Sequence, residues 1–267
     1  MSDLFSLLAP PAPSAAGLGT DGRIFGVVTG VVTNIEDPDD LRRVRVRFLW
    51  LGEEVESNWA RQAVLMGGAE MGTYFLPEVD DEVLLAFEHG DPNYPVILGS
   101  LWNGKSKPPE PADPKNNLRT IRSRSGHVVR FDDTDGAEKI EIIDKTTKNS
   151  IVFDAAANTL TLLADADVTI RSASGKVVID AAGGVEITSG AAITAKADGA
   201  VSVEAGTEAV LKSGTTLAVE AGTNGTLKAG ANLEVSAGAN GVFKAGANGN
   251  VEAGAILVVK GSLVNIN

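Results

Sequence analysis

The C-terminal part of the chain repeats one pattern of apolar and polar positions every eight residues. The repeat has the form apolar-x-apolar-x-small-Gly-x-x, with its glycine at positions 206, 214, 222, 230, 238, 246 and 254, and Gly225, Gly241 and Gly249 replace the first apolar residue in three repeats. Two apolar side chains that stand two residues apart lie on the same face of a strand. Glycine permits positive φ and close backbone approach, which suits a corner. The pattern therefore predicts short strands, each ended by a turn and stacked many times, over residues 151–267.

The apolar position three residues before each glycine predicts the core of this stack. Its occupants include Ile187, Val203, Leu211, Val219, Leu227, Val235, Phe243 and Val251. One strand buries only two modest side chains, so a single chain gains too little to offset the entropy of ordering it. Three identical chains wound together would share a core and leave no lateral sheet edge. We therefore expect a homotrimeric, intertwined triple-stranded β-helix, and the absence of proline after Pro114 fits, because every amide is needed in the ladder.

The first half of the chain alternates differently and predicts a small barrel. Polar and apolar residues alternate strictly from Arg43 to Phe48, as in a strand with one solvated face. Strands are expected at residues 25–35, 43–51, 59–65, 82–87 and 96–102, separated by turn signals such as Gly90-Asp91-Pro92-Asn93. Five or six strands in about 80 residues indicate a closed all-β barrel.

Composition divides the chain into segments. All 11 prolines lie at or before Pro114, and all three tryptophans lie in the first half. We expect a flexible or docking arm at residues 1–22, a barrel at 23–104, a Pro-rich linker at 105–118, a lead-in segment of the β-helix at 119–150, and the octad-repeat needle at 151–267. Only the first half therefore has the composition of an ordinary globular domain.

Several sequence runs in the first half resemble one known family. They are Arg45-Val46-Arg47-Phe48, Trp50-Leu51-Gly52, Ser57-Asn58-Trp59-Ala60-Arg61, Gly72-Thr73-Tyr74-Phe75-Leu76-Pro77 and Gly90-Asp91-Pro92. In this order they resemble the OB-fold domain of the VgrG and phage baseplate V spike proteins. The run from Arg119 to Ile142 is similar to the segment with which that family begins its β-helix. The resemblance implies an OB-fold barrel followed by a triple-stranded β-helix.

The resemblance also implies a function and partners. Members of this family form the central spike of a contractile injection system, such as a phage tail baseplate, a phage-like particle or a type VI secretion apparatus. Because only residues 1–22 precede the barrel, we expect a short form without a hub or lysozyme domain, docked at its N-terminal end on a separately encoded hub protein. A PAAR-type tip protein is expected at the C-terminal end, on Leu263, Val264, Ile266 and Asn267. Such a spike has no signal peptide, is assembled into its particle in the cytoplasm, and contacts the target membrane transiently while piercing the target envelope.

Charge and composition disfavour other classes of function. The formal net charge of −12 argues against nucleic acid binding, and the absence of cysteine excludes disulfides and thiolate chemistry. His89 and His127 lie far apart in turn contexts, and the acidic clusters lie at turns, where solvated carboxylates are ordinary. We therefore expect no enzyme activity, no cofactor and no metal site. No apolar run reaches the length of about 18 residues that could span a bilayer.

The residues also bear on two other interpretations. A calcium-binding β-roll is disfavoured because its nonapeptide repeat carries aspartate ligands, whereas this chain has no aspartate after Asp198. The alternative function is a trimeric fibre or adhesin-like stalk whose barrel binds a surface ligand. The basic strip of Arg42, Arg43, Arg45 and Arg47 is expected to be a partner contact or a solvated face.

Overall fold

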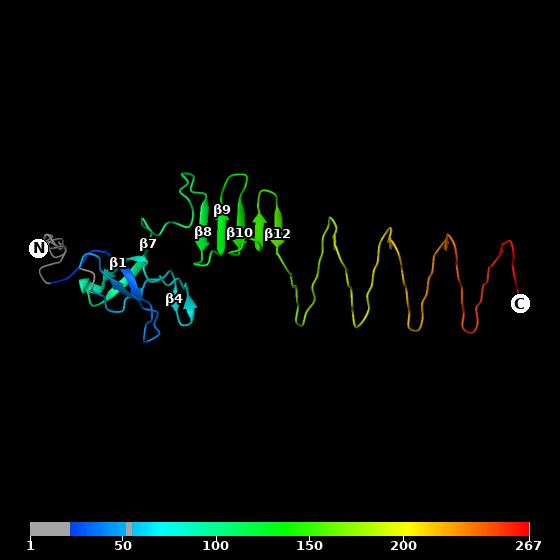
Figure 1. Cartoon of the computed structure of the whole chain (residues 1–267), viewed down its shortest axis with the longest axis horizontal. Helices are drawn as coiled ribbons and strands as arrows, with labels where there is room; N and C mark the ends of the chain where they lie inside the picture. The colour runs from blue at the N-terminus through cyan, green and yellow to red at the C-terminus, as the bar shows by residue number, and fades with distance from the viewer. Residues whose placement is uncertain (1–21, 52–54, 267) are drawn as a thin grey trace, which may run out of the picture. The chain divides into compact units, whose positions relative to one another are not determined.

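The computed structural model describes residues 22–51 and 55–266 and shows an all-β chain (Figure 1). The predicted arm, apart from Gly22, lies outside the described residues, as do Gly52 and Asn267. The chain divides into two units, of which the first ends at Val178 and the second begins at Ile179. The first unit contains all the strands of the described residues, in two five-stranded sheets and one small hairpin.

The first sheet lies within the segment predicted to form the barrel. Its strands are β1 (Val28–Asn34), β2 (Arg45–Arg47), β3 (Arg61–Gln62), β6 (Glu82–Phe87) and β7 (Pro95–Leu101), in the order β2-β1-β6-β7-β3. All five predicted strands are confirmed, although β2 and β3 are shorter than expected. Strand β3 runs parallel to β7, and the other neighbours are antiparallel. Bridges from Val44 to Ala60 and from Arg47 to Glu56 join the two edges, so the sheet curls toward closure as in an OB-fold.

Strict alternation places one side of this sheet in the core. Val44, Val46 and Phe48 are buried, as the alternation from Arg43 to Phe48 predicts, and β6 buries every second residue in the same way. The resulting core consists of Ile24, Val32, Val44, Val46, Phe48, Ala60, Val83, Leu85, Phe87 and Ile97. The barrel therefore has a hydrophobic core that one chain builds by itself.

A small hairpin between β3 and β6 has no predicting signal in the sequence. It pairs β4 (Gly67–Gly68) with β5 (Met71–Gly72), and a short 3-10 helix, η1 (Glu88–Gly90), follows β6. Glycine is rare in strands, so these residues give no strand signal. A side chain at Gly72, whose φ is +153°, would collide with the carbonyl oxygen of Met66. This hairpin therefore depends on the absence of a side chain rather than on an alternating pattern.

The second sheet is an antiparallel meander in which each strand pairs with the next one in the sequence. Its strands are β8 (Leu118–Arg122), β9 (Val128–Asp132), β10 (Lys139–Ile143), β11 (Ser150–Asp154) and β12 (Thr159–Leu163). The pairing of β11 with β10 and β12 continues past residue 151, where the octad needle was predicted to begin. These strands pair as hairpins because a tight turn reverses the chain between each strand and the next.

Beyond Leu163 the described residues form no strand, and the chain bends at regular intervals instead (Figure 1). From Gly190 to Gly254 a bend begins every eight residues, at each glycine of the repeat and at Asp198, so the predicted turn positions are confirmed. None of these corner glycines adopts the positive φ that glycine permits. No atom lies within 4 Å of a Cβ added at any of them. Within one chain, the corners therefore need neither the backbone freedom nor the small size of glycine.

Candidate functional site

The second sheet has an exposed apolar side, which we call the apolar face. Two rows of cross-strand neighbours form it: Ile121, Val129, Ile142, Ile151 and Leu162 in one row, and Phe131, Ile140, Phe153 and Leu160 in the other. Cross-strand partners point to the same side of a sheet. The exposed fraction is 54% for Ile121, 47% for Phe131 and 63% for Leu160. A contiguous apolar surface of this kind marks an interaction site.

The opposite side of the same sheet is mixed, because it carries polar residues such as Arg130 and Glu141 beside the apolar residues Leu118, Val128, Ile143, Val152 and Leu163. Arg130 of β9 forms ion pairs with Glu110 of the linker at 2.6 Å and with Glu141 of β10 at 3.3 Å. Thr120 of β8 donates a hydrogen bond to the same Glu110 carboxylate at 2.7 Å. Burial by itself raises the pKa of Glu110, but the hydrogen bonds from Thr120 and Arg130 outweigh it and hold that pKa below its usual range. Glu110 therefore fastens the Pro-rich linker to the sheet, and the sheet turns its apolar face outward.

The predicted trimer-core residues are exposed along the second unit. The exposed fraction is 85% for Val203, 75% for Leu227 and 99% for Phe243. The remaining members, Ile187, Leu211, Val219, Val235 and Val251, are exposed as well. A single chain therefore brings none of these side chains together into a core, and their assignment to a shared core stays a prediction.

The predicted tip-binding residues also lie in the second unit. Leu263 and Ile266 are 78% and 90% exposed, and Val264 is 46% exposed. Asn267 lies outside the described residues. These apolar side chains are accessible to a partner, and their role in binding a tip protein stays a prediction.

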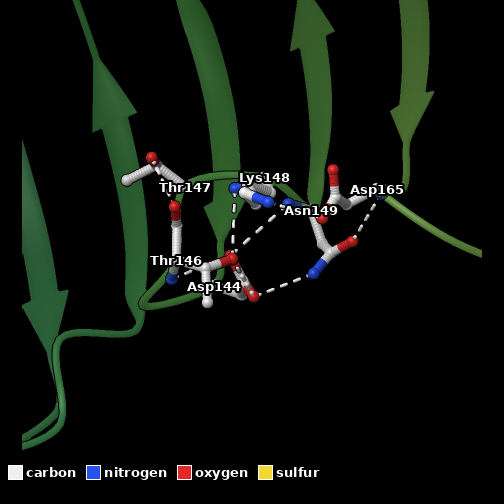
Figure 2. Close-up of polar contacts among 6 residues, drawn as sticks. All are labelled: Asp144, Thr146, Thr147, Lys148, Asn149 and Asp165. Carbon is white, nitrogen blue, oxygen red and sulfur yellow. Dashed lines mark hydrogen bonds and ion pairs between the residues drawn. The ribbon is translucent and has the colours of Figure 1, made fainter.

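One carboxylate organises the turn between β10 and β11, as Figure 2 shows. Asp144 accepts hydrogen bonds from the side chain of Asn149 at 2.9 Å and from the hydroxyl of Thr146 at 2.8 Å. The side-chain oxygen of Asn149 in turn accepts the backbone amide of Asp165 at 3.0 Å, and Lys148 pairs with Asp165 at 2.7 Å. The hydrogen bonds from Asn149 and Thr146 lower the pKa of Asp144 to about 2. The cluster thus links the turn to the chain that follows β12.

Replacement of Asp144 by asparagine should loosen this turn. The neutral side chain loses one acceptor oxygen and the charge, so we expect the backbone amides of Thr146 and Asn149, which donate to this carboxylate, to exchange at least about tenfold faster. In the natural protein the depressed pKa means that this protection is complete above the ordinary carboxyl pKa of about 3.9 and is lost as the pH falls through about 2. Amide hydrogen exchange measured by mass spectrometry checks both effects. Asp135→Asn, at an exposed position of the β9–β10 turn, is the control and should change neither.

Three of the four arginines of the basic strip on the barrel are paired with carboxylates of the same chain. Arg43 binds Asp37 at 2.6 Å, and the hydrogen bonds from Arg43 hold the pKa of Asp37 well below its usual range. Arg45 pairs with Glu56 at 3.1 Å, and its guanidinium lies 4.9 Å from the centre of the Trp59 ring. Arg42 also pairs, with Asp40 at 2.8 Å. The strip therefore presents less free positive charge than its sequence indicates.

The two histidines lie in structural settings. His89 falls in η1 with a φ of +49°, and the Nδ1 atom of His127 accepts the backbone amide of Lys145 at 3.2 Å. Within residues 22–51 and 55–266, no group of three or more histidine, aspartate or glutamate residues is placed to hold a metal ion. The same ranges contain no helix that could serve as a membrane span.

Comparison with known families covers the barrel. Residues 28–102 match the Type VI secretion system/phage-baseplate injector OB domain. These residues form an injector OB domain. The match begins at the first residue of β1 and ends one residue after β7, so it covers the whole first sheet and the hairpin inserted in it. The resemblance to VgrG and baseplate spike proteins is thereby confirmed.

Comparison with characterised proteins extends the similarity beyond the injector OB domain. The chain is 31% identical over 144 residues to the Type VI secretion system spike protein VgrG5 of Pseudomonas aeruginosa, a match that covers 50% of this chain and 18% of that protein. It is 29% identical over 130 residues to the spike protein VgrG3 of Vibrio cholerae, a match that covers 45% of this chain and 13% of that protein. It is also 28% identical over 156 residues to the actin cross-linking toxin VgrG1 of Vibrio cholerae, a match that covers 52% of this chain and 14% of that protein. The chain thus spans less than a fifth of the length of these relatives, and two of the three are named as spike proteins.

Proposed function

We propose that this chain is the homotrimeric central spike of a contractile injection system: a phage tail baseplate, a phage-like particle or a type VI secretion apparatus. One observation carries the proposal. Residues 164–266 bend with a regular period, form no strand within the chain and expose their apolar side chains. Backbone polar groups need hydrogen-bond partners, and apolar side chains gain free energy from burial. Two further copies of the chain would supply both.

The corner glycines support the same arrangement. They lack positive φ, and within one chain the space around each of them is open. Glycine at every one of these corners except Asp198 therefore meets a need that arises outside the chain. Where three chains turn at one level, the corners of neighbouring chains come close together, and a larger side chain would hold them apart.

The apolar face of the β8–β12 sheet fits a trimer in the same way. Its rows of branched and aromatic side chains are too exposed to stabilise one chain. Three such faces turned toward a common axis would bury one another and continue the core of the needle toward the injector OB domain. Burial contributes about 25 cal/mol for each Å² of apolar surface removed from water, so a contact of this extent is strongly favourable.

The work of such a trimer would be mechanical. The injector OB domains would join the needle to a separately encoded hub protein, and the far end would carry a PAAR-type tip protein on Leu263, Val264, Ile266 and Asn267. Sheath contraction would drive the needle through the target envelope, with transient contact to the target membrane. The spike would be assembled in the cytoplasm into its particle, and it would act without enzyme activity. Continuous hydrogen bonding between chains would make the shaft rigid enough to transmit force.

The mass of the protein in solution tests the proposal. Light scattering should give three times the chain mass of 27.6 kDa, and the trimer should persist when the protein is diluted to nanomolar concentrations. The reason is that the needle has no core until three chains are present. A protein with the mass of a single chain would contradict the proposal, whereas the circular dichroism of a β protein does not decide it, because the barrel has a core within one chain.

The alternative function, a trimeric stalk whose barrel binds a surface ligand, has one observation in its favour. The barrel surface is hollowed beside Leu41, Arg43, Trp59 and Tyr94, and aromatic and basic side chains of this kind bind many ligands. Binding experiments separate the two functions. A spike should bind a PAAR-type protein through its C-terminal end, whereas a stalk should bind a cell-surface ligand and lose it when Trp59 is replaced by alanine.

A further inference from the structure

Beyond residue 190 the lysines of the needle follow a period of their own, twice that of the octad, while the acidic residues Asp198, Glu208 and Glu234 lie outside this series. Lysines stand at positions 196, 212, 228, 244 and 260, and the chain has no other basic residue after residue 190. Halfway between them stand Glu204, Glu220 and Glu252, with Ser236 in the fourth interval. The same position of successive octads therefore reads Lys, Glu, Lys, Glu, Lys, Ser, Lys, Glu, Lys. We call this series the charge column.

The structure gives every member of the charge column the same setting. Each one up to Glu252 lies two residues before the start of a bend, as Lys212 lies before the bend at Gly214. Each also directly follows the residue predicted to point inward, such as Leu211 before Lys212. Neighbours in an extended segment point to opposite sides, so the charge column would face outward when the apolar residues face the core.

No member of the charge column is neutralised within its own chain. The ion pairs of the described residues all lie between Asp37 and Asp165, and none involves a residue of the second unit. All the column residues are exposed. Successive members are separated along the chain by a bend, so the opposite charges do not meet within one chain. A regular alternation of sign without intrachain pairing indicates that the pairing partner is another copy of the chain.

We propose that the charge column forms a ladder of lysine–glutamate pairs between chains and that this ladder sets the axial register of the trimer. The inference rests on the proposed three-stranded needle. In such a needle with threefold symmetry, each chain moves to the next face after every octad. The strands stacked on one face therefore come from successive octads of different chains. Lys212 of one chain then lies between Glu204 and Glu220 of the other two, about 4.8 Å away on either side.

The alternation of charge sign along the column distinguishes the correct axial register of the three chains from a register that is displaced by one octad. The octads are so alike that a chain displaced by one octad would still place apolar residues inward and glycines at the corners. The hydrophobic pattern alone therefore opposes such a slip only weakly. A slip of one octad, however, brings octads of equal sign together, so that the displaced chain places lysine beside lysine and glutamate beside glutamate. Each lysine–glutamate attraction between the displaced chain and its neighbours is then replaced by a repulsion between like charges. The charge alternation therefore disfavours the slipped trimer relative to the correct one.

Ser236 provides the test because it is the one neutral member of the column between Lys228 and Lys244. Ser236→Glu would complete the alternation, whereas Ser236→Lys would place a lysine next to two others. We expect urea unfolding of the trimer, followed by far-UV circular dichroism at about 10 mM salt, to show a higher midpoint for Ser236→Glu and a lower one for Ser236→Lys than for the natural protein. The difference should largely disappear in about 1 M NaCl, where the Debye length is only about 3 Å. Equal midpoints, or a higher midpoint for the lysine variant, would overturn the ladder.

A matched pair of variants controls for the general effect of a charge on the needle. Thr215 lies at a bend, and the residues eight positions away, Thr207 and Thr223, are uncharged. Thr215→Glu and Thr215→Lys should therefore unfold at midpoints that differ much less than those of the Ser236 pair. Light scattering on every variant separates the two hypotheses. Monomers throughout would refute the trimer itself, whereas intact trimers with indifferent midpoints would refute only the ladder.

Discussion

Replacement of Val203 by aspartate is expected to abolish the trimer, leaving monomers or aggregates where the natural protein gives three chains. Val203 occupies the inward position of its octad and is 85% exposed within one chain. In the proposed needle its three copies meet in the core. An unpaired carboxylate costs several kcal/mol to bury, and three at one level also repel one another. This cost exceeds the roughly 1.5–3 kcal/mol that a buried valine or leucine contributes. Light scattering of the purified variant gives the answer.

Ser202→Asp is the matched control, because it introduces the same side chain one position earlier. Neighbouring residues of a strand point to opposite sides, so this aspartate should face solvent and leave the trimer intact. Its effect on the unfolding midpoint should be small. Intact trimers of Val203→Asp would show that the inward assignment is wrong. Loss of trimers in both variants would show that the two sides of the strand are equally sensitive to charge, which the needle does not allow.

Replacement of Leu85 by alanine is expected to destabilise the injector OB domain by about 2–5 kcal/mol. Leu85 lies in the middle of β6 and is fully buried in the core that one chain builds by itself. Its truncation removes apolar contacts and leaves a cavity that the surrounding strands fill only partly. Trp50, Trp59 and Trp102 all lie within the matched domain, so tryptophan fluorescence reports the unfolding of this domain separately from the needle.

Leu84→Ala is the control for this second effect. Leu84 precedes Leu85 in the same strand but points to the other side and is only half-buried. We expect the free energy of unfolding of this domain to fall by less than about 1.5 kcal/mol, because folding removes less apolar surface from water at this position. Similar losses for the two variants would contradict the alternation of β6. The mass of both variants should remain that of a trimer, since the needle core lies elsewhere.

Alternation over a strand was the most reliable signal in this sequence. The run from Arg43 to Phe48 predicted which of its residues are buried, and the structure confirms Val44, Val46 and Phe48 in the core. The eight-residue spacing of glycine predicted the bends with equal success. Both signals are local, because they depend on the two sides of an extended segment and on where that segment ends. The corner glycines do not use the positive φ that glycine permits, since a bend can form without it.

Contacts between distant residues could not be predicted in this way. Glu110 stands in a proline-rich run that indicates a flexible connector, yet it is held by Thr120 and Arg130 of the following sheet. Asp144 and Asn149 read as ordinary turn residues, and only the structure shows that Asn149 also binds Asp165. Each of these roles requires a partner whose position depends on strand pairing. Residue types alone do not specify that pairing.

The sequence by itself determined that the chain is all-β, where the barrel strands run, and where the C-terminal segment bends. These features follow from the period of the side chains and from the absence of proline and large residues at the corners. Only the tertiary structure decided that the β8–β12 strands pair as a meander through Leu163, and that the side of the sheet with Arg130 and Glu141 faces Glu110 while the apolar face lies on the other side. The reason is physical: periodicity places a side chain on one side of a strand, whereas hydrogen-bonded pairing and charge decide what that side meets.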